Sequence, residues 1–70
     1  MIKFNELKKS CKSGIHEILF QLDILDLNED DKVESYFDKL PIDIKLDGER
    51  WGFNDSVVQG DMHVFFESLK

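Results

Sequence analysis

The sequence predicts an α+β fold, in which helices pack on a small antiparallel sheet in the order α-α-β-β-α. Three observations support this prediction: helical spacing of apolar residues in the first forty positions, alternating apolar residues around Asp47-Gly48, and a second helical pattern after residue 55. A chain of 70 residues buries only about 60% of the surface that it exposes when unfolded. We therefore expect residues 1–70 to form a single domain with one core.

The first element is a helix expected from about residue 4 to residue 25. Apolar side chains recur there at intervals of three and four, which places them on one helical face. Gly14 follows Ser13 within this run, and glycine inside a helix costs about 1 kcal/mol relative to alanine. We therefore expect a kink or a break near these two residues. The predicted face consists of Phe4, Leu7, Cys11, Ile15, Ile18, Leu22 and Leu25.

A second helix is expected over residues 29–39. Asn28 is the expected N-cap, and the three acids that follow it favour the positive end of the helix dipole. Pro41 ends the run, because proline has no backbone N–H to continue the helical hydrogen bonding. The face expected to enter the core consists of Val33, Tyr36, Phe37 and Leu40.

A β-hairpin is predicted over residues 42–53. Asp-Gly is a favoured two-residue turn, and apolar residues alternate with polar ones on both sides of Asp47-Gly48. If this pair forms the turn, Ile44 faces Trp51 across the two strands. A two-stranded sheet is marginal in water, so the hairpin must pack on the helices or pair with another chain.

The C-terminal segment is predicted to form a third helix, with Asn54 or Asp55 as its cap. The alternative is a strand pair with a turn at Gly60-Asp61, because β-branched and aromatic residues lie on both sides of it. We favour the helix over the strands. Its core face would consist of Val58, Met62, Phe65, Phe66 and Leu69.

Charge is distributed unevenly along this acidic chain, whose formal net charge is -6. Residues 1–16 contain four lysines against one acid, whereas residues 17–38 contain eight acids against one lysine. Direct nucleic-acid binding needs clustered Lys and Arg, and Arg50 is the only arginine, so we do not expect it. The chain has no signal-peptide pattern at its start and no apolar run near the ~20 residues that span a bilayer, so we expect a cytoplasmic protein that binds no membrane.

Few side chains offer catalytic or metal-binding chemistry. Cys11, His16 and Glu17 are the nearest set for nucleophilic catalysis, but on a helix positions 11 and 16 point to different faces. The acids from Asp26 onward match part of a calcium loop, yet Asp31 stands at its turn glycine and Phe37 at its bidentate glutamate. We therefore expect no catalytic residue, no metal site and no cofactor.

The function predicted from these features is non-catalytic binding of a partner protein that has a basic surface. Rows of carboxylates can occupy such a surface in place of phosphates, and the complementary field speeds association. Small acidic inhibitors and nucleic-acid mimics act in this way, including phage anti-defence proteins of the anti-CRISPR type, immunity proteins and antitoxins. The expected binding face consists of Asp23, Asp26, Asp30, Asp31, Glu34 and Asp38.

An alternative function is that of an adaptor or a homo-oligomer, such as a homodimer, that acts through an exposed aromatic patch. Eight aromatic residues in a chain of 70 are many for a core this small. Burial of such a patch against a partner would be insensitive to salt, unlike binding through carboxylates. The patch would consist of Trp51, Phe53, Phe65 and Phe66.

Overall fold

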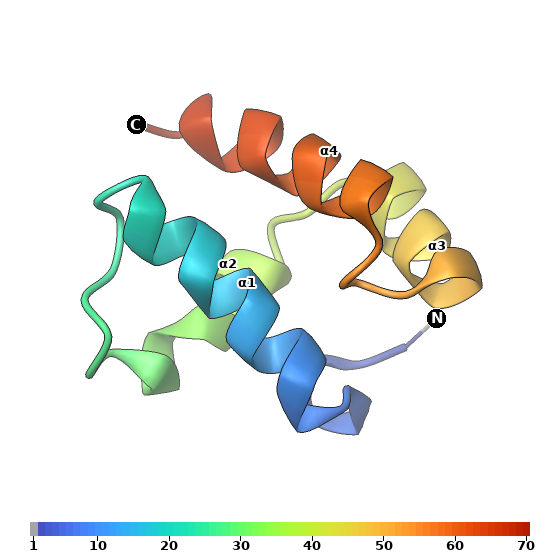
Figure 1. Cartoon of the computed structure of the whole chain (residues 1–70), viewed down its shortest axis with the longest axis horizontal. Coiled ribbons are helices and arrows are strands. Elements are labelled where there is room, and N and C mark those ends of the chain that lie inside the picture. The colour runs from blue at the N-terminus through green and yellow to red at the C-terminus, as the bar shows by residue number, and fades with distance from the viewer. Residues whose placement is uncertain (1) are drawn as a thin grey trace.

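A computed structural model describes residues 2–70, which fold into four α-helices and two short 3-10 turns (Figure 1). Over these residues the chain is 67% helical and contains no β-strand. The predicted α+β class and its β-hairpin are therefore wrong, because the segment expected to form the hairpin is a helix. The elements are η1 (Phe4–Glu6), α1 (Lys9–Gln21), η2 (Asp30–Lys32), α2 (Val33–Phe37), α3 (Ile42–Trp51) and α4 (Ser56–Glu67).

The first helix is shorter than the predicted span of residues 4–25. The chain breaks after η1, because Leu7 and Lys8 have an extended backbone with ψ values of 149° and 150°. This break turns the ring of Phe4 onto that of Phe37, and the two ring centroids lie 5.5 Å apart. The N-terminal turn thus packs on α2 instead of extending α1.

The kink predicted at Ser13-Gly14 does not form, and α1 runs through both residues. Gly14 serves packing between helices: a Cβ there would lie 2.9 Å from the side-chain nitrogen of Gln59 in α4. The side-chain oxygen of Asn54 lies still nearer to that Cβ position, so the absent side chain leaves room for the side chains of Asn54 and Gln59 against α1.

The second predicted helix is represented by η2 and the short helix α2. Asn28 does not cap it, since Glu29 is the residue that precedes η2, and its side chain makes no cap hydrogen bond there. The Glu29 carboxylate instead accepts a hydrogen bond from the backbone N–H of Asp26, at 2.9 Å. Helix α2 ends at Phe37, before Pro41, which is the N-cap residue of α3.

Helix α3 occupies most of the segment predicted to form the hairpin. Pro41 precedes it with a φ of -60°, and Asp43 in the first turn and Arg50 in the last turn complement the helix dipole. A helix satisfies its backbone hydrogen bonds internally, whereas a lone two-stranded hairpin leaves most of them on open edges. Ile44 accordingly packs half-buried against the core and does not face Trp51, the last residue of the helix.

The Asp47-Gly48 pair lies inside α3 and forms no turn. Gly48 is the buried residue of this helix, and a Cβ at its position would overlap the ring of Phe53. Gly52 ends the helix with a φ of 97°, which residues with a side chain rarely adopt. Phe53 thereby folds back over Gly48, and its ring centroid lies 5.4 Å from that of Phe37.

Helix α4 confirms the prediction of a helix in the C-terminal segment and excludes the alternative turn at Gly60-Asp61. The Asp55 carboxylate caps it by accepting hydrogen bonds from the backbone N–H groups of Val57 and Val58, at 3.0 and 3.4 Å. Most of its predicted core face is also confirmed. Val58, Met62 and Phe66 are buried, Phe65 is half-buried and Leu69 is 44% exposed.

The four helices enclose one hydrophobic core. Helix α1 contacts both α2 and α4, and α4 also contacts α3 (Figure 1). The longest helix, α1, has 13 residues, and within residues 2–70 no helix has the length and apolar character needed to cross a membrane. The charged side chains of the loop after α1 and of α2 remain outside this core.

Candidate functional site

The six acids predicted to bind a partner are all exposed. They follow one stretch of chain, from the loop after α1 through η2 to the end of α2 (Figure 1). We refer to this set as the acidic surface. Asp23 and Asp26 lie in the loop after α1, Asp30 and Asp31 in η2, Glu34 in α2, and Asp38 at the C-cap of α2.

The loop that begins the acidic surface starts with a helix-ending motif. The backbone N–H of Ile24 donates to the carbonyl oxygen of Leu19 at 2.9 Å, and that of Asp23 donates to the carbonyl oxygen of Phe20 at 3.0 Å. This pair of hydrogen bonds is a Schellman motif, which needs one residue in the left-handed region. Asp23 is the residue in the left-handed region, with a φ of 58°. Among residues 2–70 it is the only non-glycine residue with a positive φ.

Replacing Asp23 with glycine is expected to raise the free energy of unfolding by up to about 1 kcal/mol. Glycine has no Cβ to clash in the left-handed region, although its own backbone entropy offsets part of the gain. Urea denaturation followed by far-UV circular dichroism measures the change. Asp23→Ala removes the same charge but keeps a Cβ, so equal stabilisation by both variants would assign the effect to charge and contradict the backbone explanation.

The middle of the loop is held by polar contacts on two sides. The Glu29 carboxylate accepts from the Asp26 N–H and lies 2.6 Å from the ammonium group of Lys32. The hydrogen bond from the Asp26 N–H, and then the contact with Lys32, lower the pKa of Glu29 from its ordinary value of 4.5. The stabilisation that these contacts give is complete above pH 4.5. It is lost as the pH falls through the lowered pKa of Glu29 in the folded protein. On the opposite side, Nε2 of His16 donates to the carbonyl oxygen of Asp26 at 2.9 Å, which joins the loop to α1.

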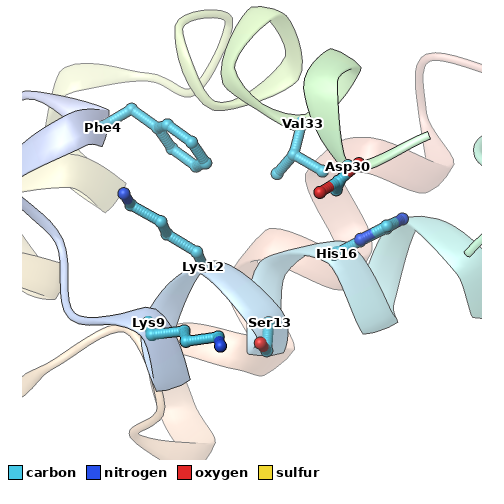
Figure 2. Close-up of a pocket in the computed structure, with 7 residues that line it drawn as sticks. All are labelled: Phe4, Lys9, Lys12, Ser13, His16, Asp30 and Val33. Carbon is cyan, nitrogen blue, oxygen red and sulfur yellow. The ribbon is translucent and has the colours of Figure 1, made fainter. Parts of the chain in front are cut away.

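The acids after this loop do not form the straight stripe that one continuous helix would give. The turn η2 places Asp30 toward α1, where it lines a pocket together with His16 and Lys12 (Figure 2). Glu34 and Asp38 stay one helical turn apart, exposed on α2. One edge of the acidic surface therefore meets the polar residues of α1, while the rest faces solvent.

Few cations reach the acidic surface. The ammonium group of Lys45 donates to the backbone carbonyl oxygen of Asp38 at 3.2 Å. Lys32 interacts electrostatically with Asp31, but neither lysine forms an ion pair with one of the six carboxylates. Lys32 is the only cation in residues 17–38, and its ammonium group pairs with Glu29, which is not one of the six acids. Within the described part of the chain, no Lys, Arg or His nitrogen lies within 4.0 Å of any of the six carboxylates. Such uncompensated charge attracts cationic surfaces over about 8 Å at physiological ionic strength.

The four residues of the alternative aromatic patch do not share one surface. Trp51 is 65% exposed and Phe65 is half-buried, whereas Phe53 and Phe66 lie in the core. Other exposed apolar residues lie on α3 and α4, and helical spacing would have been the signal for them, over residues 42–51 in α3 and over residues 56–67 in α4. These residues are Ile42, Leu46, Val57 and Val64.

Side chains with nucleophilic or metal-binding groups are dispersed over the molecule. Cys11 lines a hollow beside Gly48 and Phe53, whereas His16 lines the pocket beside Asp30. Among residues 2–70, no three His, Cys, Asp or Glu side chains are placed to hold a metal ion.

The chain matches no known protein family, no curated protein and no solved structure. No activity can therefore be transferred from a relative, and the function has to be inferred from exposure, charge and geometry.

Proposed function

We propose that the protein is a non-catalytic binding module that docks its acidic surface on a basic surface of a partner protein. The observation that carries this proposal is the exposure of six acids along one stretch of chain without a cation to pair with them. Like charges one helical turn apart, such as Glu34 and Asp38, cost a few tenths of a kcal/mol in an isolated helix. Lysines and arginines of a partner would relieve this repulsion on binding.

The partner class that fits this surface is a nuclease or another nucleic-acid-binding protein, and the module would act as its inhibitor. A groove built to neutralise phosphates presents the clustered Lys and Arg side chains that carboxylates can engage. Electrostatic attraction of this kind mainly raises the association rate and falls steeply with salt. We place the interaction in the cytoplasm, a setting in keeping with the single free cysteine.

Three isosteric substitutions in one chain test the proposal: Asp31→Asn, Glu34→Gln and Asp38→Asn. The parent protein and this variant serve as bait in a cell lysate at about 0.1 M and about 1 M salt, where the Debye length falls from about 10 Å to about 3 Å. Mass spectrometry identifies the retained proteins. We expect the parent protein to retain a protein with a basic surface that is lost in the variant and at high salt.

A matched control removes the same three charges outside the acidic surface, through Asp43→Asn, Asp61→Asn and Glu67→Gln, all at exposed positions. This control is expected to keep the partner. Equal loss from both triple variants would assign retention to net charge and overturn the proposal. The proposal would also be overturned if the retained proteins were the same for the parent protein and the acidic-surface variant, at low and at high salt.

A second candidate function, assembly through an apolar surface, is favoured by the exposure of Trp51 at the end of α3. Ile42 and Leu46 of the same helix are also exposed, at 58% and 48%, but the helical period of 3.6 residues places them on another face than Trp51. Tryptophan is enriched among the residues that dominate protein–protein interfaces. Retention that survives high salt and both triple variants, but is lost in Trp51→Ala, would support assembly in place of inhibition.

A further inference from the structure

A pocket of about 270 Å³ opens between η1, the first half of α1 and the start of α2 (Figure 2). Helix α1 lines it with Lys9, Lys12, Ser13 and His16, whose spacing of three and four residues puts them on one helical face. Phe4 and Val33 form an apolar wall, and Asp30 completes the lining. The pocket thus combines cationic, hydroxyl and apolar groups from three separate elements.

Neither lysine of this pocket is held in an ion pair among the described residues, although the carboxylate of Asp30 lines the same pocket. Across the described residues, no carboxylate oxygen lies within 4.0 Å of the ammonium group of Lys9 or Lys12. The Lys12 ammonium group lies over the ring of Phe4, 5.4 Å from its centroid, and this cation–π contact holds it beside the apolar wall. In a chain with fifteen acids and nine basic residues, α1 therefore presents a local cationic site.

We propose that this pocket binds a small phosphate monoester. The phosphate lies beside the ammonium group of Lys9 and the hydroxyl of Ser13, which Figure 2 shows on the same side of the pocket, and the Lys12 side chain rotates from the Phe4 ring to join them. A phosphate monoester carries a charge of about -1.5 to -2 at neutral pH, which two ammonium groups match. Its oxygens accept hydrogen bonds from all three donors, and Lys is a common phosphate ligand in proteins. The apolar wall of Phe4 and Val33 then faces the organic group of the ester.

The size of the pocket limits the ester to a small molecule. Pockets for drug-sized ligands span about 300–1,000 Å³, and this one is slightly below that range. Asp30 fixes the orientation of the ligand, since Figure 2 shows its carboxylate beside His16, at the end of the pocket away from Lys9. This carboxylate repels an anion, so Asp30→Asn is expected to strengthen phosphate binding several-fold.

The test is a nuclear magnetic resonance titration of the isotopically labelled protein at constant ionic strength. The three probes are phenyl phosphate, inorganic phosphate, and benzoate, which carries a ring but only a single charge. We expect saturable shifts confined to the backbone amides of residues 9–16 and 30–33, with the tightest binding for phenyl phosphate. Lys9→Gln and Lys12→Gln are each expected to weaken it about tenfold, the effect of losing one charge-assisted hydrogen bond.

Lys70→Gln is the matched control, because it removes the same charge from an exposed residue that does not line the pocket. Lys9 makes no aromatic contact, so Lys9→Gln tests the site with the least disturbance of the fold, which far-UV circular dichroism verifies. Benzoate binding as tight as that of phenyl phosphate would overturn the phosphate assignment. Shifts that grow linearly, spread over the whole protein, or weaken equally in Lys70→Gln would overturn the site itself.

Discussion

Replacing Phe37 with alanine is expected to leave most of the protein unfolded in water. The Phe37 side chain is 1% exposed, and its ring centroid lies 5.5 Å from that of Phe4 and 5.4 Å from that of Phe53. One ring thus joins η1, α2 and the segment after α3. Deleting a buried phenylalanine costs about 3–5 kcal/mol, and the core of so small a domain supplies only about 3–5 kcal/mol of net stability.

Urea denaturation followed by far-UV circular dichroism measures this loss. Phe20→Ala is the control, because the Phe20 ring is 42% exposed at the end of α1 and makes no aromatic pair with another described residue. This control is expected to keep a cooperative unfolding transition. If Phe37→Ala unfolded at the urea concentration of the parent protein, the central position of this ring would be contradicted.

The same substitution at two helical glycines is expected to change stability in opposite directions. Gly48→Ala should lower the free energy of unfolding by about 1–3 kcal/mol, because its methyl group would overlap the buried ring of Phe53. Gly60→Ala should raise it by up to about 1 kcal/mol, because the space around Gly60 is open and alanine favours a helix.

The comparison isolates the contact between α3 and Phe53, since both variants gain the same intrinsic helix propensity. The difference between their urea midpoints, measured at equal protein concentration, reports how much stability is lost when a methyl group at position 48 overlaps the Phe53 ring. Two variants of equal stability would mean that the Phe53 ring does not cover Gly48.

The helices whose apolar spacing agrees with their packing could be predicted from the sequence. Ile15, Ile18 and Leu22 are buried as their spacing indicates, and Asp55 caps α4. The break after η1 could not be predicted, because neither proline nor glycine marks it. It forms where Phe4 reaches a ring 33 positions away in the sequence, a contact that no local pattern encodes.

The wrong hairpin prediction has a physical cause in α3. An Asp-Gly pair suits a tight turn, but glycine also serves where a ring must approach a helix, and Gly48 has the second role. The alternation of Ile42, Ile44 and Leu46 likewise fits a strand, yet Ile42 and Leu46 remain exposed on the helix. Tertiary packing of Phe53 on Gly48 favours the helix over the hairpin that the local pattern predicted.

The exposure of the acidic surface could be predicted, because charged residues seldom enter a core without a partner. The shape of the acidic surface could not be predicted. The turn of Asp30 toward α1 depends on η2, and the pocket beside it depends on the break that brings Phe4 over Lys12. Both features arise where segments distant in the sequence meet.

Trp51 is the only tryptophan in the chain, and its indole lies mostly in water at the end of α3. Its surroundings are therefore aqueous both before and after unfolding, so intrinsic fluorescence is a weak probe of folding in this protein. The same emission responds strongly when another molecule covers the indole and excludes water. The natural sequence thus contains an optical reporter for docking at α3, which requires no added label and is separate from the core that keeps the protein folded.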